Sequence, residues 1–259
     1  MKVIPSTLGE MKRRGEKIAA LTAYDFVTAK IMDEAGIELI LVGDSLGTVV
    51  LGYENTLTVT MEEMLHHTRA VARAKPQALV VGDMPFRSYE TIELARMNAN
   101  KFLQAGADAV KIEGGEAIAK RVAVLTPTIP VLGHIGLLPQ SVPQGEGFHV
   151  QGRTTESAER LLRDAKAIEQ AGAFAIVIEC TVADVAREIT AALKIPTIGI
   201  GAGNGCDGQI LVSSDILGLF TCFKHAKQYV NLSEEMRRAF LAYRHEVETG
   251  QFPDREHSF

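Results

Sequence analysis

The sequence predicts a single (β/α)₈ TIM barrel domain over residues 1–259, with an N-terminal capping helix and extra C-terminal helices. Three observations favour this class: eight short apolar runs typical of strands, amphipathic helical patterns between them, and a chain length close to the roughly 250 residues of known barrels. Strands that alternate with helices pair in parallel, as βαβ units. A doubly wound open sheet is the alternative, but AYDFVTAK follows the first strand where that fold usually has a glycine-rich turn.

The eight predicted strands lie in the apolar runs 18–24, 38–44, 78–83, 109–114, 129–135, 175–180, 196–201 and 209–215. Between them, the segments 91–106 and 157–172 carry apolar residues at helical spacing, such as Leu161, Ala165 and Ile168. An Ala-Gly pair precedes the second, fourth and sixth strands. Each glycine suits the position just after a helix, where a left-handed residue ends the helix.

The two ends of the chain lie outside this repeat. The stretch up to Lys17 predicts a helix capped at Ser6 or Thr7, which would close the bottom of the barrel. The stretch 232–250 predicts a further helix that must pack on the barrel wall or on a partner subunit. Its apolar stripe consists of Met236, Phe240, Tyr243 and Val247.

Composition excludes several classes of protein. A net charge of −5 argues against nucleic-acid binding, which favours a basic chain. The sequence has neither the apolar core of a signal peptide nor a run of about 18 apolar residues that could cross a membrane. The three cysteines, Cys180, Cys206 and Cys222, show no CxxC spacing. We therefore expect a reduced, cytoplasmic protein without membrane contact.

The active site of a TIM barrel lies at the carboxyl ends of its strands. The polar residues expected at those ends are Asp25, Asp44, Asp83, Glu113, His134, Glu179 and Asp215. Asp25 and Asp215 are equally well explained as helix caps. The whole set is harder to explain in that way, because five or more carboxylates at one mouth repel one another unless a cation lies among them. Oxygen ligands without a His/Cys cluster favour Mg²⁺ over Zn²⁺.

The fourth strand carries two charges on one face. In VKIEGG, Lys111 and Glu113 are two residues apart and so point to the same side, whereas Val110 and Ile112 point to the other. We expect the apolar pair to face the helices and the charged pair to face a polar cavity. Lys111 would then offer a positive charge to an anionic substrate or a developing oxyanion.

Other candidates are more ambiguous. His134 either assists proton transfer or is an oriented, satisfied histidine. Cys180 should point away from Glu179, which argues against a nucleophile. The GIGAG stretch (199–203) suits a phosphate loop or the close approach of a large cofactor. The segment 136–156 lacks periodicity, so it predicts a lid over the site.

Several stretches together resemble the ketopantoate hydroxymethyltransferase family: LTAYD (21–25), LVGDSLGTVVLGYENTLTVT (41–60), LVVGDMPFRSY (79–89), VKIEGG (110–115), GHIGLLPQ (133–140) and GIGAGNGCDGQILV (199–212). The resemblance implies a TIM barrel that transfers a one-carbon unit from 5,10-methylenetetrahydrofolate to 3-methyl-2-oxobutanoate. The product is ketopantoate, an intermediate of pantothenate and coenzyme A biosynthesis. The family commonly forms homodecamers, which would give the C-terminal helix a partner surface.

The same resemblance implies roles for individual residues. The Mg²⁺ ligands fall on Asp44 and Asp83, with Glu113 completing the site directly or through water. The keto acid would bind at Asp44, Ser45, Asp83 and Lys111, and Glu179 would take the proton from C3 to give an enolate that attacks the methylene carbon of the folate. The loop NGC (204–206) departs from relatives in a way that bears on the folate contacts rather than on the metal site.

Two other functions are compatible with parts of the sequence. Lyases of the isocitrate lyase and phosphoenolpyruvate mutase type also combine a barrel, Mg²⁺ and an enolate, but they carry a KKCGH motif that this chain lacks. A non-catalytic barrel that binds a keto acid is the third possibility. Such a protein would have no need to keep Lys111, Glu113 and Glu179 together on the inner face.

Overall fold

The computed structural model describes residues 1–141, 149–220 and 223–259. These residues form two compact units, 1–212 and 213–259. The first unit contains the barrel. The prediction of one domain over the whole chain stays a prediction.

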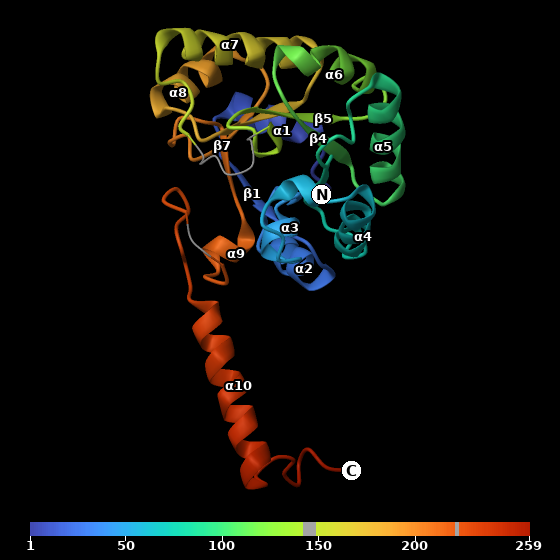
Figure 1. Cartoon of the computed structure of the whole chain (residues 1–259), viewed down its shortest axis with the longest axis vertical. Helices are drawn as coiled ribbons and strands as arrows, with labels where there is room; N and C mark the ends of the chain where they lie inside the picture. Colours follow the sequence, from blue (N-terminus) through green and yellow to red (C-terminus); the bar gives the residue numbers. More distant parts are fainter. Residues whose placement is uncertain (142–148, 221–222) are drawn as a thin grey trace. The chain divides into compact units, whose positions relative to one another are not determined.

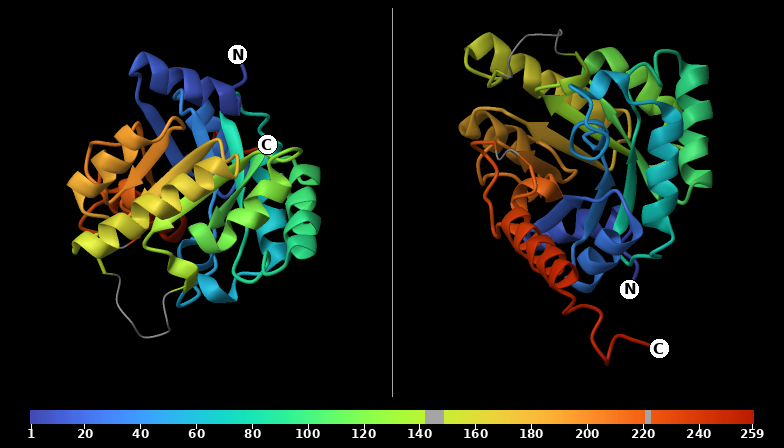
Figure 2. Two further views of the ribbon diagram at one scale, coloured as in Figure 1. Left: turned by 90° about the horizontal axis from the view of Figure 1, so that it is seen from above. Right: turned by 60° about the horizontal axis from the view of Figure 1, so that its bottom comes forward.

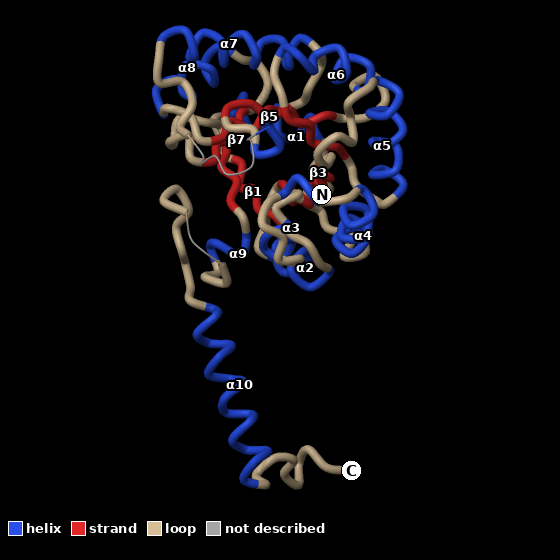
Figure 3. The backbone as a smooth tube through the Cα atoms, viewed as in Figure 1, coloured by secondary structure: helices blue, strands red, loops and turns tan. Residues whose placement is uncertain are grey.

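Eight parallel strands close into a barrel in chain order, from β1 round to β8 (Figures 1 and 3). The strands are β1 (Ile18–Thr22), β2 (Leu39–Val42), β3 (Leu79–Asp83), β4 (Ala109–Glu113), β5 (Val131–Gly136), β6 (Ala175–Glu179), β7 (Thr197–Ile200) and β8 (Gly208–Leu211). Closure is made by β1 pairing with β8, where Ala20 lies opposite Ile210. The predicted fold class and all eight predicted strands are confirmed.

Helices surround the strands, as the views in Figure 2 also show. They are α2 (Phe26–Glu34), α3 (Leu46–Val49), α4 (Met61–Ala72), α5 (Ile92–Gln104), α6 (Ala119–Leu125), α7 (Thr155–Gln170) and α8 (Ala183–Ala192), with 3₁₀ turns η1 (Thr56–Thr58), η2 (Glu116–Ile118) and η3 (Pro139–Ser141). Several begin at a side-chain cap, such as Thr60 before α4, whose hydroxyl accepts from the Glu63 N–H. In the predicted lid segment 136–156, residues 142–148 lie outside the described part of the chain.

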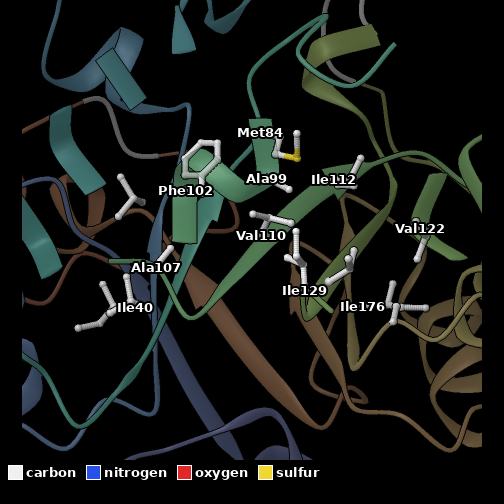
Figure 4. Close-up of a cluster of buried hydrophobic side chains, with 14 of the residues drawn as sticks. Ile40, Met84, Ala99, Phe102, Ala107, Val110, Ile112, Val122, Ile129 and Ile176 are labelled. Carbon is white, nitrogen blue, oxygen red and sulfur yellow. The ribbon is translucent and has the colours of Figure 1, made fainter. Parts of the chain in front are cut away.

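Alternation along each strand divides the core into two layers. Inward residues such as Leu79, Val81 and Ala109 fill the barrel, and outward residues pack under the helices. Figure 4 shows part of the outer layer, with Phe102 and Ala99 of α5 and Val110 and Ile112 of β4 in one cluster of buried side chains. The predicted orientation of β4 is therefore confirmed, and it turns Lys111 and Glu113 into the barrel.

Helix α1 (Pro5–Arg14) packs its buried Leu8 and Met11 with the inward residues at the starts of the strands. The expected closure of the barrel bottom is thus confirmed. The expected cap is wrong, because the helix begins at Pro5 with Ile4 as its N-cap. Proline suits the first helical position, where its missing N–H is not needed, and Thr7 instead accepts a hydrogen bond from the Ile4 N–H at 3.3 Å.

The second unit contains α9 (Ser213–Ile216) and α10 (Leu232–Thr249). The predicted C-terminal helix is therefore present. None of its side chains is buried, so the stripe of Met236, Phe240, Tyr243 and Val247 is exposed to solvent. Among the described helices, none is both long and apolar enough to cross a membrane.

Candidate active site

Five neighbouring strands, β2 to β6, bring the predicted site residues together at their carboxyl ends. Asp44 follows β2, Asp83 and Glu113 end β3 and β4, His134 lies in β5 and Glu179 ends β6. The register places Asp83 opposite Lys111, and Glu113 opposite His134. Residues from distant parts of the chain thus form one buried polar cluster inside the mouth of the barrel.

The Lys111 ammonium lies between two carboxylates. Its Nζ donates to both oxygens of Asp83 at 2.9 Å and to Glu113 Oε1 at 3.2 Å. Burial alone would lower the pKa of Lys111, but the charges of Asp83, Glu113 and Asp44 outweigh it and raise that pKa well above its usual range. Burial likewise opposes ionisation of Glu113, yet the charges of Lys111 and His134 bring the pKa of Glu113 down to about 2. Lys111 and Glu113 are therefore both charged.

Asp44 and Asp83 form an acidic pair. The Asp44 backbone N–H donates to Asp83 Oδ2 at 3.3 Å, and both side chains are buried. Burial and the charge of Asp83 raise the pKa of Asp44 well above its usual value. Burial also raises the pKa of Asp83, although the Lys111 charge opposes this. The ionised pair is thus short of positive charge, a condition that a bound cation relieves.

His134 bridges two acids. Its Nδ1 lies 3.2 Å from Glu113 Oε1 and its Nε2 lies 3.2 Å from Glu179 Oε2, although neither approach has hydrogen-bond direction. Burial and the Lys111 charge would lower the pKa of His134, but the two acids raise it to about 9. The Glu179 side chain is 19% exposed to solvent, whereas the Glu113 side chain is only 2% exposed. Glu179 is therefore the carboxylate most open to a substrate.

Ser45, predicted to hold the substrate, immediately follows Asp44. Its hydroxyl lies 2.9 Å from the Tyr24 hydroxyl, and the Tyr24 carbonyl lies 2.7 Å from His67 Nδ1. A chain of polar contacts from α4 therefore orients Ser45 beside the acidic pair.

Two residues of the site, Gln140 and Tyr89, were not predicted from the sequence. Gln140 Nε2 donates to Asp44 Oδ2 at 2.9 Å, and the Tyr89 hydroxyl donates to Gln140 Oε1 at 2.7 Å. The only sequence signal was indirect, since both residues end stretches that resemble the family. A glutamine and a tyrosine in loops carry no pattern that predicts contact with a carboxylate.

Other candidates have local explanations. Asp25 caps α2, because it accepts from the Thr28 N–H and hydroxyl. Burial raises the pKa of the Cys180 thiol, which does not favour a nucleophile. In GIGAG, Gly203 has a φ of +75°, and a Cβ there would lie 2.6 Å from Ala183, so conformation and packing already require this glycine. Asp215 belongs to α9 of the second unit and is not assigned to this site.

The donor set suits a hard divalent cation. Four carboxyl groups (Asp44, Asp83, Glu113 and Glu179) face two basic groups (Lys111 and His134), so full ionisation leaves two negative charges. No three acidic, histidine or cysteine side chains of the described residues are arranged to hold one metal ion together. Mg²⁺ needs only one or two carboxylates beside water and substrate, so Asp44 and Asp83 fit it without a third ligand.

Solved structures confirm the barrel architecture. Phosphonopyruvate hydrolase, in a complex with oxalate and Mg²⁺, superposes with a TM-score of 0.66 over 99% of this chain and 93% of that chain, at 15% identity. A 2,3-dimethylmalate lyase of the PEP mutase/isocitrate lyase superfamily gives a TM-score of 0.62 over 100% of this chain and 92% of that chain, at 17% identity. At such identities the likeness shows the fold alone.

Sequence relatives are far closer. Proteins named 3-methyl-2-oxobutanoate hydroxymethyltransferase match at 56% identity in Syntrophus aciditrophicus (100% of this chain, 97% of the relative) and at 54% in Enterococcus faecalis (100% and 96%). The family model described as ketopantoate hydroxymethyltransferase matches residues 2–255. The chain therefore belongs to the ketopantoate hydroxymethyltransferase family, a family of transferases.

Proposed function

We propose that the chain transfers a hydroxymethyl group from 5,10-methylenetetrahydrofolate to 3-methyl-2-oxobutanoate, giving ketopantoate for pantothenate and coenzyme A biosynthesis. The observation that carries this proposal is the cluster itself: an acidic pair, a buried lysine and a more exposed glutamate converge at one mouth in a chain of this family. The folate is the co-substrate that supplies the one-carbon unit.

The keto acid would bind at Asp44, Ser45, Asp83 and Lys111. Lys111 supplies the positive charge that an α-keto carboxylate requires, because its ammonium is protonated and already oriented by Asp83. The Ser45 hydroxyl, held by Tyr24, supplies a neutral donor at the same edge. The buried setting strengthens both interactions by excluding water.

Mg²⁺ would be held by Asp44 and Asp83, with Glu113 joining directly or through water, and it would supply Lewis-acid stabilisation of the negative charge that forms on the keto oxygen. The Glu113 carboxylate is shielded from solvent, because Lys111, His134 and the Gln140 N–H surround it. Its second role is therefore to hold Lys111 and His134 in place.

Glu179 would remove the proton from C3 of the keto acid. The C3–H bond breaks, the proton moves to the Glu179 carboxylate, and the electron pair enters the enolate. The enolate carbon then forms a bond to the methylene carbon of the folate as the first of its two C–N bonds breaks. Water supplies the hydroxyl as the second C–N bond breaks, and the C3 proton and one proton of water pass to the two nitrogens of the departing tetrahydrofolate. His134 Nε2 lies 3.2 Å from Glu179 Oε2, so a protonated His134 places a positive charge beside the proposed base.

We further propose a homo-oligomer, a decamer as in the family, located in the cytoplasm. The apolar stripe of α10 supports this, because its four side chains remain exposed, although the Tyr243 ring contacts Phe252 of the same unit. The barrel also leaves Ala19 of β1 and Gln209 of β8 exposed, whereas parallel sheets are normally covered on both faces. Analytical ultracentrifugation would measure the assembly, and a monomer would contradict it.

Cys180 and Cys206 are free thiols, as expected in a reducing compartment.

The proposal is tested by the loss of the C3 proton of 3-methyl-2-oxobutanoate in D₂O, followed by proton NMR. We expect exchange that requires both Mg²⁺ and Glu179, and therefore none in Glu179→Gln. The matched control is Glu188→Gln, which removes an exposed carboxylate on α8. Exchange that persists in Glu179→Gln would refute the assignment of the base.

Methylenetetrahydrofolate is then added to the same samples. Formation of ketopantoate by the wild-type protein is the expected result. Cleavage of a hydroxy acid without folate, and no ketopantoate with it, would instead favour a lyase of the type that shares this fold.

A further inference from the structure

Gln140 is buried at the mouth of the barrel although it lies in a connection rather than in a strand. It belongs to the short turn η3 after β5, and only 3% of its surface is exposed. A buried amide must find partners for its donors and its acceptor, so its contacts decide its role.

The side-chain amide and the backbone N–H of Gln140 are all engaged at the site. Nε2 donates to Asp44 Oδ2 at 2.9 Å and to the Met84 carbonyl at 3.0 Å, and Oε1 accepts from the Tyr89 hydroxyl at 2.7 Å. The backbone N–H donates to Glu113 Oε2 at 3.2 Å. Because Asp44 and the carbonyl are both acceptors, the NH₂ group must face them, which fixes the orientation of the amide.

These contacts join two carboxylates of the proposed cation site. Asp44 comes from the end of β2 and Glu113 from the end of β4, and one residue after β5 holds an oxygen of each. A hydrogen bond to Oδ2 sets the rotation of the Asp44 carboxylate about its Cβ–Cγ bond. An amide does so without adding charge, whereas a lysine would compete with the cation and a glutamate would repel Asp44.

We propose that Gln140 is a positioning residue: its side-chain amide and backbone N–H hold Asp44 and Glu113 in the orientation that binds the divalent cation, and Tyr89 holds the amide. This inference rests on the proposed function, because the cation site is part of it. Gln140 acts through Asp44 and Glu113 and need not touch the keto acid. Loss of Gln140 should therefore weaken cation binding more than it slows the chemical step of the cation-loaded enzyme.

The test measures cation binding without turnover. Mn²⁺ is titrated into the metal-free protein in the absence of keto acid and folate, and free Mn²⁺ is followed by EPR. Gln140→Met keeps the length of the side chain and removes its hydrogen bonds, and we expect its Mn²⁺ dissociation constant to rise about 10- to 100-fold. Tyr89→Phe removes only the hydroxyl, and we expect a rise of about two- to tenfold.

The matched control is Gln209→Met. Gln209 Nε2 also donates one hydrogen bond, to the Gly203 carbonyl at 2.9 Å, but from β8 and away from the cluster. Its Mn²⁺ affinity should equal that of the wild type. Melting temperatures measured in EDTA show whether each variant is folded. If Gln140→Met does not fold, the proposal is tested with Tyr89→Phe.

Steady-state kinetics separate positioning from a general structural defect. In Gln140→Met, raising Mg²⁺ should restore most of kcat, while the Mg²⁺ concentration for half-maximal rate stays elevated. An unchanged Mn²⁺ dissociation constant in both Gln140→Met and Tyr89→Phe would overturn the inference, as would a wild-type protein that binds no Mn²⁺. Failure of the proposed function is seen separately, as a wild-type protein that binds Mn²⁺ but makes no ketopantoate.

Discussion

Lys111 is the residue whose removal should disturb the barrel most. Its ammonium makes three charge-assisted hydrogen bonds, two to Asp83 at 2.9 Å and one to Glu113 at 3.2 Å, in a site where its side chain is 5% exposed. Lys111→Met keeps the aliphatic stem but leaves both carboxylates buried without their cation. Breaking a buried ion pair by removing one partner costs about 3–5 kcal/mol, because the remaining charge is uncompensated.

The free energy of unfolding is measured by urea denaturation at pH 7.5 in EDTA, so that no bound cation replaces the ammonium. We expect Lys111→Met to lose about 3–5 kcal/mol relative to the wild type. The double variant Lys111→Met, Asp83→Asn should recover part of this loss, because the second substitution removes one of the stranded charges. As a control, Lys30→Met removes an exposed lysine on α2, and it should change stability by no more than about 0.5 kcal/mol.

A loss of less than about 1 kcal/mol in Lys111→Met would refute this reasoning, because it would show that water or protonation compensates the carboxylates in the folded protein. Strict additivity in the double variant would refute the coupling between Lys111 and Asp83. In the first case the cluster would not be the desolvated site that its burial indicates.

Four further predictions concern packing, capping and protonation. Phe102→Ala should destabilise the barrel by about 3–5 kcal/mol in urea denaturation, because it empties a fully buried site under β3 and β4. Gly82→Ala should also lower the urea midpoint, since its Cβ would lie 2.3 Å from the Phe102 ring. Thr60→Ala should cost about 1 kcal/mol by removing the cap of α4, and an unchanged midpoint would show that the cap is dispensable. In the metal-free protein, the folded-state pKa of His134 is raised from 6.5 to about 9. Its contribution to stability is therefore fully present below about pH 6.5 and is lost as the pH rises through about 9. The difference in unfolding free energy between wild type and His134→Gln should shrink over that interval, and a constant difference would contradict it.

The sequence by itself determined the repeating architecture, because the signals are local. Apolar runs, helical spacing and glycines after helices predicted every strand and the class of the fold. Two-residue alternation put Lys111 and Glu113 on one face of the strand, and the apolar Val110 and Ile112 suited the opposite face, which packs under the helices. The location of TIM-barrel active sites at the carboxyl ends of the strands similarly placed Asp44, Asp83 and Glu179 at one mouth of the barrel.

Tertiary structure alone decided which of these groups touch. Sequence spacing could not separate Asp25, which caps its own helix, from Asp44, which joins Asp83 across two strands. Nor could it find Gln140, because its partners Asp44 and Glu113 lie 96 and 27 residues away and meet it only through the register of a closed barrel. Hydrogen bonds depend on tenths of an ångström and on direction, and neither is encoded in a local pattern of residue types.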